Sequence, residues 1–328
     1  MTVEIRRLQS TRDGTFLVTL PKEWAKRFNL QKGSPIHVKE RVDGCLILDP
    51  RYGAEEAQEI VLRPSERMED NILSSYLLGY EFVAVEAAGR LSEEERERVK
   101  RTASRLIGVE VIEEDERRIL LQCLLRATAI PPEKILRRQY ILSKSLLDDS
   151  FKALLSLNLG EAEKIRDRDE EIDRLYFLLV RILRSLIVNP RLGEKLGISP
   201  IDCLDYRLVA SLVEKIADTS VEVAELVGRL KAQGGIPKAF HSFLKTFSGK
   251  LSSTYEDALK AVFSRGERTV SQALKSLQEA MESLKSLEED ALKRKGNPPA
   301  LDILLTLLGT LLDQIKDITD LAYPRPQP

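Results

Sequence analysis

The stretch LVEKIADTS at residues 212–220 recurs near the end of the chain as LLDQIKDIT at residues 311–319. Each copy places a carboxylate, and an aspartate four residues later, between apolar residues at helical spacing. That spacing stacks both carboxylates on one face of a helix, one turn apart. The recurrence indicates an internal repeat. Its acidic residues are Glu214 and Asp218 in the first copy and Asp313 and Asp317 in the second.

The repeat lies in a region, residues 128–323, whose apolar residues recur at three- and four-residue spacing almost throughout. Glycine, proline and asparagine interrupt the pattern at five places: 158–160, 189–190, 234–237, 265–266 and 296–299. We therefore expect about six long helices joined by short turns, which pack naturally as antiparallel bundles.

A second acidic pair, Asp169 and Asp173, has the same spacing on the middle helix of the first half. If that helix lies against the one with Glu214 and Asp218, four carboxylates face each other. Such hard oxygen ligands suit Mg, Mn, Ca or iron. The alternative is an ordinary solvated helix face on which the carboxylates pair locally with arginines. The candidate arginines are Arg166, Arg168 and Arg174.

Residues 1–50 predict short strands around one helix. Strand-like runs at Val3–Leu8 and Phe16–Leu20 flank a turn signal, and Pro21 opens a short helix that ends near Phe28. A hairpin over residues 36–48 follows. Fifty residues with so few large apolar groups cannot form a sufficient core. The segment needs a partner, most simply a second copy of itself.

Residues 51–127 predict a small α/β unit with the element order β-α-β-α-β-β. Ser92–Glu95 is a capping box that opens a charged helix. No phosphate loop, metal-ligand spacing or nucleophile stands out in this segment.

Composition limits the classes of function. The chain has 328 residues, with 51 Lys and Arg against 52 Asp and Glu, so any nucleic-acid contact must come from a local patch. Three cysteines do not make a disulfide framework and fit a reducing cytoplasm. Two histidines leave little for zinc or Ser-His-Asp chemistry, and we expect no enzyme. No apolar stretch reaches the roughly 20 residues that a membrane span needs, so we expect no integral membrane protein.

The residues 213–225 resemble the L-E-R-I-G-D-x-A-x-x-I-A-E signature of PhoU domains, the phosphate-uptake regulators, and Asp169–Asp173 resembles that family's D-x-x-(V/I)-D. The resemblance implies two tandem three-helix bundles over residues 128–323, with metal ions on the bundle surface. It implies one metal site made of Asp169, Asp173, Glu214 and Asp218. A second site would use Asp313 and Asp317. There the preceding helix offers Glu267–Gln272, without an Asp pair, so that site is degenerate.

The first fifty residues resemble the SpoVT/AbrB swapped-hairpin domain. The resemblance rests on Arg6–Leu8, Thr15–Leu20, Pro21–Trp24 and Leu30–Gly33. It implies an interleaved homodimer that binds DNA through basic side chains. Such domains often carry an arginine where this chain has Phe16 and Leu17. The basic side chains of this chain would then contact mainly the phosphates of DNA. The residues expected to make it are Arg6, Arg7, Arg12, Lys26 and Arg27.

Residues 1–50 hold nine basic and six acidic residues, a net charge of +3 per chain and +6 per dimer. An AbrB-like head joined to a PhoU-like tail resembles archaeal phosphate regulators. We therefore expect a cytoplasmic, dimeric, DNA-binding regulator of phosphate uptake with a metal-binding helical sensor region. The alternative is an interaction protein that restrains a phosphate transporter or its signalling partner, with the head serving only dimerisation.

The expected architecture is mainly α. It has a β swapped hairpin at 1–50, a small α/β unit at 51–127, tandem three-helix bundles at 128–323 and a disordered tail at 324–328.

Overall fold

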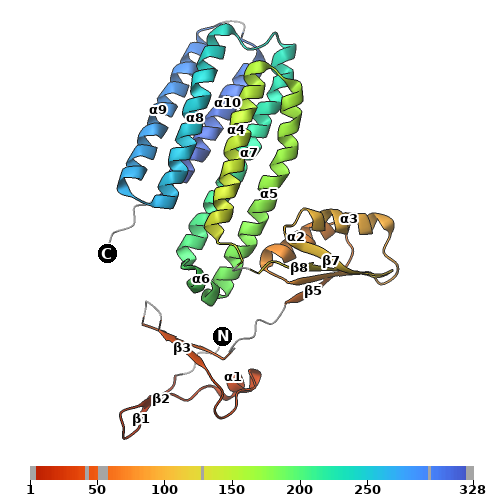
Figure 1. Ribbon diagram of the computed structural model, residues 1–328, viewed down its shortest axis with the longest axis vertical. Coiled ribbons are helices and arrows are strands. Elements are labelled where there is room, and N and C mark those ends of the chain that lie inside the picture. The colour runs from red at the N-terminus through yellow and green to blue at the C-terminus, as the bar shows by residue number, and fades with distance from the viewer. Residues whose placement is uncertain (1–4, 41–43, 51–57, 127–128, 295–296, 323–328) are drawn as a thin grey trace. The chain divides into compact units, whose positions relative to one another are not determined.

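The computed structural model describes residues 5–40, 44–50, 58–126, 129–294 and 297–322. The chain divides into two compact units, residues 1–57 and 58–328 (Figure 1). The second unit contains a small α/β part followed by a large helical part. The domain boundaries expected near residues 50 and 127 stay predictions, and the expected tail at 324–328 lies outside the described residues.

The described residues of the N-terminal unit form two separate hairpins and one short helix. The elements are β1 (Gln9–Ser10), β2 (Phe16–Leu17), α1 (Lys22–Arg27), β3 (His37–Glu40) and β4 (Leu46–Asp49). β1 pairs with β2, and β3 pairs with β4, both antiparallel. The ring of Trp24 contacts that of Phe28 edge to face, 5.5 Å between centroids. The predicted helix after Pro21 and the predicted second hairpin are both present.

The first strand lies later in the chain than the run Val3–Leu8 predicts. Gln9 pairs with Leu17 and Ser10 with Phe16, because a tight turn closes directly after them. In that turn the Thr11 amide donates to the Thr15 carbonyl at 2.9 Å. Gly14 has φ +80°, a conformation that favours glycine. The geometry of the turn therefore places the strand pairing at the polar residues Gln9 and Ser10. Val3, the first residue of the predicted strand, lies outside the described residues.

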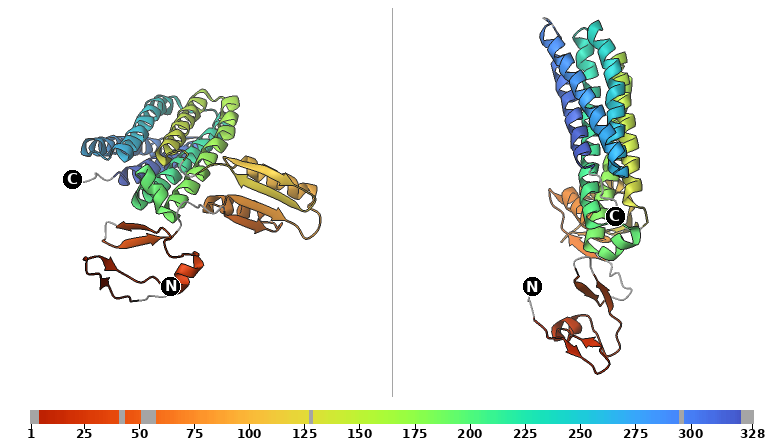
Figure 2. Two further views of the ribbon diagram at one scale, coloured as in Figure 1. Left: turned by 60° about the horizontal axis from the view of Figure 1, so that its bottom comes forward. Right: turned by 90° about the vertical axis from the view of Figure 1, so that its left-hand side faces the viewer.

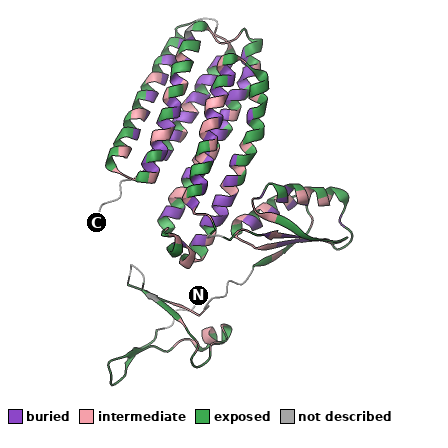
Figure 3. Ribbon diagram, viewed as in Figure 1, coloured by how far each residue is buried: buried purple, intermediate pink, exposed green. Residues whose placement is uncertain are grey.

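No described residue of the N-terminal unit is buried (Figure 3). Eight large apolar side chains in it are at least 41% exposed: Ile5, Leu8, Phe16, Leu17, Val18, Val38, Leu46 and Ile47. The described residues of a single copy therefore form no hydrophobic core of their own.

The α/β part has the predicted element order. Its elements are β5 (Glu59–Leu62), α2 (Met68–Leu78), β6 (Phe82–Glu86), α3 (Glu93–Ser104), β7 (Val109–Glu114) and β8 (Arg118–Cys123). The sheet order is β5-β6-β8-β7, with β5 parallel to β6 and the other pairs antiparallel.

Alternate residues of the central strand β6 pack with the helices of the α/β part. Val83 and Val85 of β6 share a buried cluster with Ile72 of α2 and Val99 of α3, and both helices cover this face of the sheet (Figure 2). The predicted capping box is formed, since Ser92 accepts from the Glu95 amide at 3.2 Å.

The described residues of the helical part form six long helices and one short helix, as the periodicity predicts. They are α4 (Pro132–Ser156), α5 (Leu159–Val188), α6 (Pro190–Leu196), α7 (Pro200–Ala232), α8 (Lys238–Ser264), α9 (Glu267–Leu292) and α10 (Pro299–Asp320). α4, α5 and α7 pack together as one three-helix bundle, and α8, α9 and α10 as a second. α7 contacts α10 and α4 contacts α8, so one hydrophobic core runs through both bundles. The mainly helical fold with tandem bundles is confirmed.

In both bundles the first two helices are joined in the same way. Leu157 directly follows α4 and Arg265 directly follows α8, and both residues have left-handed backbone angles, with φ of 50° and 48°. Arg265 also ties the second bundle to the first. Its guanidinium lies 3.3 Å from Asp202 and 2.9 Å from Asp205, both on α7.

Replacing Arg265 with alanine should destabilise the helical part. The side chains of Asp202 and Asp205 are only 10% and 17% exposed, and the variant would remove the guanidinium from both. We expect the free energy of unfolding, measured by urea denaturation with circular dichroism, to fall by about 2–3 kcal/mol. Arg268→Ala, at an exposed position of α9, should change it by less than about 0.5 kcal/mol. Equal losses in the two variants would contradict this role of Arg265.

Candidate functional site

Helices α5 and α7 bring the four acidic residues of the first bundle together. Asp169 and Asp173 lie one turn apart on α5, and Glu214 and Asp218 lie one turn apart on α7. The two helices pack along their apolar faces, which places both pairs at the edge of the helix contact. Asp169, Asp173 and Glu214 are half-buried, and Asp218 is exposed.

The four carboxylates interact electrostatically. Burial, followed by the charges of Asp173 and Asp218, raises the pKa of Asp169 to about 7. Burial, followed by Asp218, Asp173 and Asp169, likewise raises the pKa of Glu214 to about 7. Burial and the charge of Asp218 also raise the pKa of Asp173. Burial raises the pKa of Asp218, and a hydrogen bond with Asp169 opposes that rise.

Two of the three arginines that could neutralise this cluster locally form ion pairs elsewhere. Arg168 pairs with Asp149 on α4 at 2.6 Å, and Arg166 pairs with Glu225 on α7. The acidic cluster therefore keeps an excess of negative charge.

The donor set fits a hard cation. Oδ1 of Asp169 is buried without a hydrogen-bond partner, and carboxylate oxygens are the ligands that Mg, Mn, Ca and iron favour. Among the described residues, however, no three Asp, Glu, His or Cys side chains already converge as ligands.

The second half of the repeat does not reproduce this cluster. Asp313 and Asp317 lie on α10 and are exposed. Counting from the left-handed residues Leu157 and Arg265, the positions of Asp169 and Asp173 correspond to Leu277 and Met281 of α9. The stretch Glu267–Gln272, matched to this place from sequence, lies earlier in α9. Apolar side chains therefore stand where the first bundle has its aspartates.

The five basic residues expected to contact DNA are all exposed. Arg6 and Arg7 precede β1, and Arg12 lies in the β1–β2 turn. Lys26 and Arg27 form the last turn of α1, where Lys26 also lies 3.3 Å from Glu23. All five side chains are therefore accessible from solvent.

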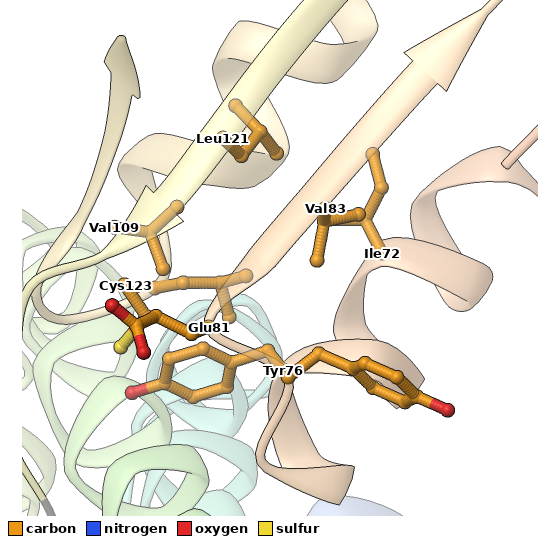
Figure 4. Close-up of a pocket in the computed structure, with 9 residues that line it drawn as sticks. Ile72, Tyr76, Glu81, Val83, Val109, Leu121 and Cys123 are labelled. Carbon is orange, nitrogen blue, oxygen red and sulfur yellow. The ribbon is translucent and has the colours of Figure 1, made fainter. Parts of the chain in front are cut away.

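The α/β part contains a small cavity between α2, the turn from α3 to β7, and the sheet (Figure 4). Its volume is about 10 Å³, the space of a single water molecule. The residues that line it are Ile72, Tyr76, Tyr80, Glu81, Val83, Leu106, Val109, Leu121 and Cys123. The Tyr76 hydroxyl donates to the Ile107 carbonyl at 3.0 Å. A cavity of this size is a packing gap and has no room for an organic ligand.

Two arginines that were not singled out from the sequence involve α5. Arg181 of α5 is 7% exposed and bonds to α2, and Arg105 at the end of α3 acts on Asp173. The sequence holds one signal for Arg181, which interrupts the apolar run of residues 175–188. A charge inside such a run must find a partner.

Among the described helices, none is long and apolar enough to cross a membrane.

Comparison with known proteins identifies one part of the chain. Residues 136–227, which run from α4 through most of α7, match the PhoU domain. No curated protein matches the chain. The structure of PhoU from Pseudomonas aeruginosa is similar at 14% identity with a TM-score of 0.46, over 58% of this chain and 93% of that one. A PhoU-like phosphate regulatory protein from Shewanella oneidensis MR-1 is similar at 17% identity with a TM-score of 0.43, over 60% and 96%. The acidic cluster thus lies within the segment that matches the PhoU domain.

The raised pKa values predict that the metal-free protein loses stability as the pH rises. Asp169 and Glu214 titrate at about 7 in the folded protein, against ordinary pKa values of 3.8 and 4.5. Between about pH 4.5 and 7 the folded state holds more protons than the unfolded state, so the free energy of unfolding falls with pH. Urea denaturation in EDTA at pH 5 and pH 8 measures this.

Asp169→Asn should remove part of the repulsion. We expect it to increase stability more at pH 8 than at pH 5. Asp317→Asn, at the exposed position on α10, is the matched control and should show no such difference. A pH-independent effect of Asp169→Asn would show that the carboxylates do not interact.

Proposed function

We propose that this chain is a dimeric regulator of phosphate uptake that binds a divalent or iron-type metal ion in its first bundle and DNA through its N-terminal unit. The observation that carries the proposal is the acidic cluster on α5 and α7, inside the segment that matches the PhoU domain. Resemblance to phosphate-uptake regulators supplies the biological process.

The metal ion would be held by Asp169, Asp173, Glu214 and Asp218. A bound cation would neutralise carboxylates that burial and mutual repulsion disfavour, and Asp169 would gain a partner for its buried Oδ1. Asp313 and Asp317 would at most form a weaker site, since one helix supplies both and both are exposed.

The N-terminal unit would form the dimer. Its described residues include no buried side chain, and its exposed apolar residues lie on both hairpins, so a single copy lacks the burial that stabilises a fold. A second copy interleaved with the first would cover them. This arrangement agrees with the resemblance to the SpoVT/AbrB domain.

DNA contact would come from Arg6, Arg7, Arg12, Lys26 and Arg27, doubled by dimerisation. With a net charge of +6 in the paired segments, binding would depend largely on phosphate contacts and therefore on salt.

The second candidate function is control of a phosphate transporter or its signalling partner through direct protein contact. Exposed apolar residues at the end of α5 and at the start of α7 favour it. Val188 is 77% exposed, Ile201 69% and Leu204 58%. In this case the N-terminal unit would serve only dimerisation.

Metal content tests the first part of the proposal. We expect the purified protein to bind Mn²⁺ or iron, and the double variant Glu214→Gln/Asp218→Asn to lose that binding. Changing a residue that only supports a metal ligand typically weakens metal affinity by roughly 10- to 100-fold. Removing two ligands should weaken it by more than that. Elemental analysis and calorimetric titration measure it. Asp313→Asn/Asp317→Asn is the control that should retain the ion. Equal metal content in both double variants would refute the site.

DNA binding separates the two candidate functions. We expect tighter binding to DNA from upstream of the chain's own gene than to scrambled DNA, measured by fluorescence anisotropy across a salt series. In Arg6→Gln/Arg7→Gln/Arg12→Gln the affinity should fall, and the log–log salt slope should decrease by about 0.9 for each phosphate that the variant no longer neutralises. Lys245→Gln, an exposed change on α8, is the charge control. Equal weak binding of both DNAs, unchanged in the triple variant, would favour the protein-contact function.

A further inference from the structure

The core of the first bundle contains two polar side chains of α4, Gln139 and Ser143, which are both fully buried. Nε2 of Gln139 donates to the Ala210 carbonyl at 3.2 Å, and Oγ of Ser143 donates to the Val213 carbonyl at 3.0 Å. Both carbonyls belong to α7. Two hydrogen bonds on successive turns therefore join side chains of α4 to the backbone of α7.

The contacted backbone is the part of α7 that carries its acidic pair. In an α-helix each carbonyl accepts the amide four residues later, so the Ala210 carbonyl also accepts the amide of Glu214. In the same way the Val213 carbonyl accepts the amide of Ala217, which directly precedes Asp218. The two side chains of α4 therefore bind the turns of α7 from which these carboxylates project.

A third polar side chain extends this contact to the second bundle. The hydroxyl of Tyr255, which is fully buried on α8, donates to Oγ of Ser143 at 3.3 Å. The Tyr255 ring also meets that of Tyr140 edge to face, 5.0 Å between centroids. Hydrogen bonds thus run from α8 through α4 to α7. Gln139, Ser143 and Tyr255 together are the polar core residues.

α4 also holds the helix with the other acidic pair. Arg168 of α5 donates to Asp149 at 2.6 Å and to Ser145 at 2.9 Å, both on α4. The short turn Leu157–Asn158 joins the two helices. α4 carries none of the four carboxylates, but it contacts both helices that do. Its contacts therefore set the height of one acidic pair relative to the other.

Packing alone does not explain polar side chains at these places. By the same count from the left-handed residues, Gln139 corresponds to Phe247 of α8 and Ser143 to Leu251, and both of these are buried and apolar. The second bundle, which lacks the aspartates, thus packs with apolar residues here. Within the described residues, Oε1 of Gln139 is buried and has no hydrogen-bond partner, which costs stability.

We propose that the polar core residues are positioning residues, whose hydrogen bonds fix the axial position of α7 against α4 and so place Glu214 and Asp218 opposite the aspartates of α5. This inference rests on the metal binding proposed above, since it assigns the residues that hold the metal ligands in place. Apolar contacts are non-directional, whereas a hydrogen bond to one carbonyl forms at one axial position only. A buried polar side chain sets the register of packed helices in this way at a cost in stability.

Metal affinity and stability should change in different ways. The triple variant Gln139→Met/Ser143→Ala/Tyr255→Phe removes the polar groups, and the carbonyls on α7 keep their helical hydrogen bonds. We expect the midpoint of its urea denaturation to stay at or above that of wild type. Its affinity for Mn²⁺ in calorimetric titration should fall roughly 10- to 100-fold, as it does when a residue that supports a metal ligand is changed.

Ser150→Ala is the matched control for the triple variant. Ser150 is also a buried serine of α4, but its hydroxyl donates to the Leu147 carbonyl of the same helix at 2.8 Å. We expect this variant to bind Mn²⁺ as wild type does. Equal Mn²⁺ affinity of the triple variant and the control would overturn the proposal. Gln139→Met alone gives the same comparison if the triple variant fails to fold.

The axial position of α7 can be measured without metal. Spin labels at Lys134→Cys on α4 and Arg229→Cys on α7, both exposed positions, report the distance between the two helices along the bundle. Cys45→Ser removes the exposed native cysteine, and an excess of unlabelled chains limits the signal to distances within one chain. By pulsed EPR we expect a narrow distance distribution with the native core and a broadened or double distribution in the triple variant.

The two measurements keep this inference separate from the proposed function. If wild type binds no Mn²⁺, the metal-binding function is wrong, and the distance distributions still decide whether the polar core residues fix α7. If Mn²⁺ binds and the distributions of wild type and triple variant coincide, the positioning role alone is wrong. A broadened distribution with unchanged Mn²⁺ affinity would likewise refute the placing of the ligands.

Discussion

The packing of α5 against α7 is the contact on which the first bundle and its acidic cluster depend. Buried side chains such as Ile172 and Leu175 on α5 and Val213 and Ile216 on α7 belong to one core. Their burial holds the two helices together. The acidic residues at the edge of the same contact are partly desolvated as a result. The hydrophobic effect thereby holds in place a group of like charges that would separate in water. A bound cation would offset the repulsion among them.

The two units of the chain are stabilised in different ways. The helical part buries a continuous core through its long helices, and ion pairs such as that of Arg265 join its two bundles. The N-terminal unit has hairpins and a helix but no buried described residue. The described residues of a single copy therefore supply little of the burial that stabilises a fold.

Much of the fold could be predicted from periodicity and turn residues. The six long helices, the β-α-β-α-β-β order and the Ser92 capping box follow from local patterns, because these are set by neighbours in the chain. The predicted first strand lies too early, since the turn at Thr11–Gly14 fixes the pairing of Gln9 with Leu17 more strongly than the apolar run before it. In the sequence Arg181 interrupts an apolar helix, and its carbonyl partners on α2 lie about a hundred residues away.

The sequence by itself determined which residues share a helix face, because a four-residue spacing places Asp169 above Asp173 and Glu214 above Asp218 in any helix. It also determined that the second half lacks an aspartate pair before Asp313. Only the tertiary structure decided that the two acidic pairs interact, that Arg166 and Arg168 are engaged elsewhere, and that the charge of Arg105 acts on Asp173. These interactions join residues that are far apart in the sequence and come together only when the helices pack. The burial of a side chain and the charges around it therefore leave no local pattern in the sequence.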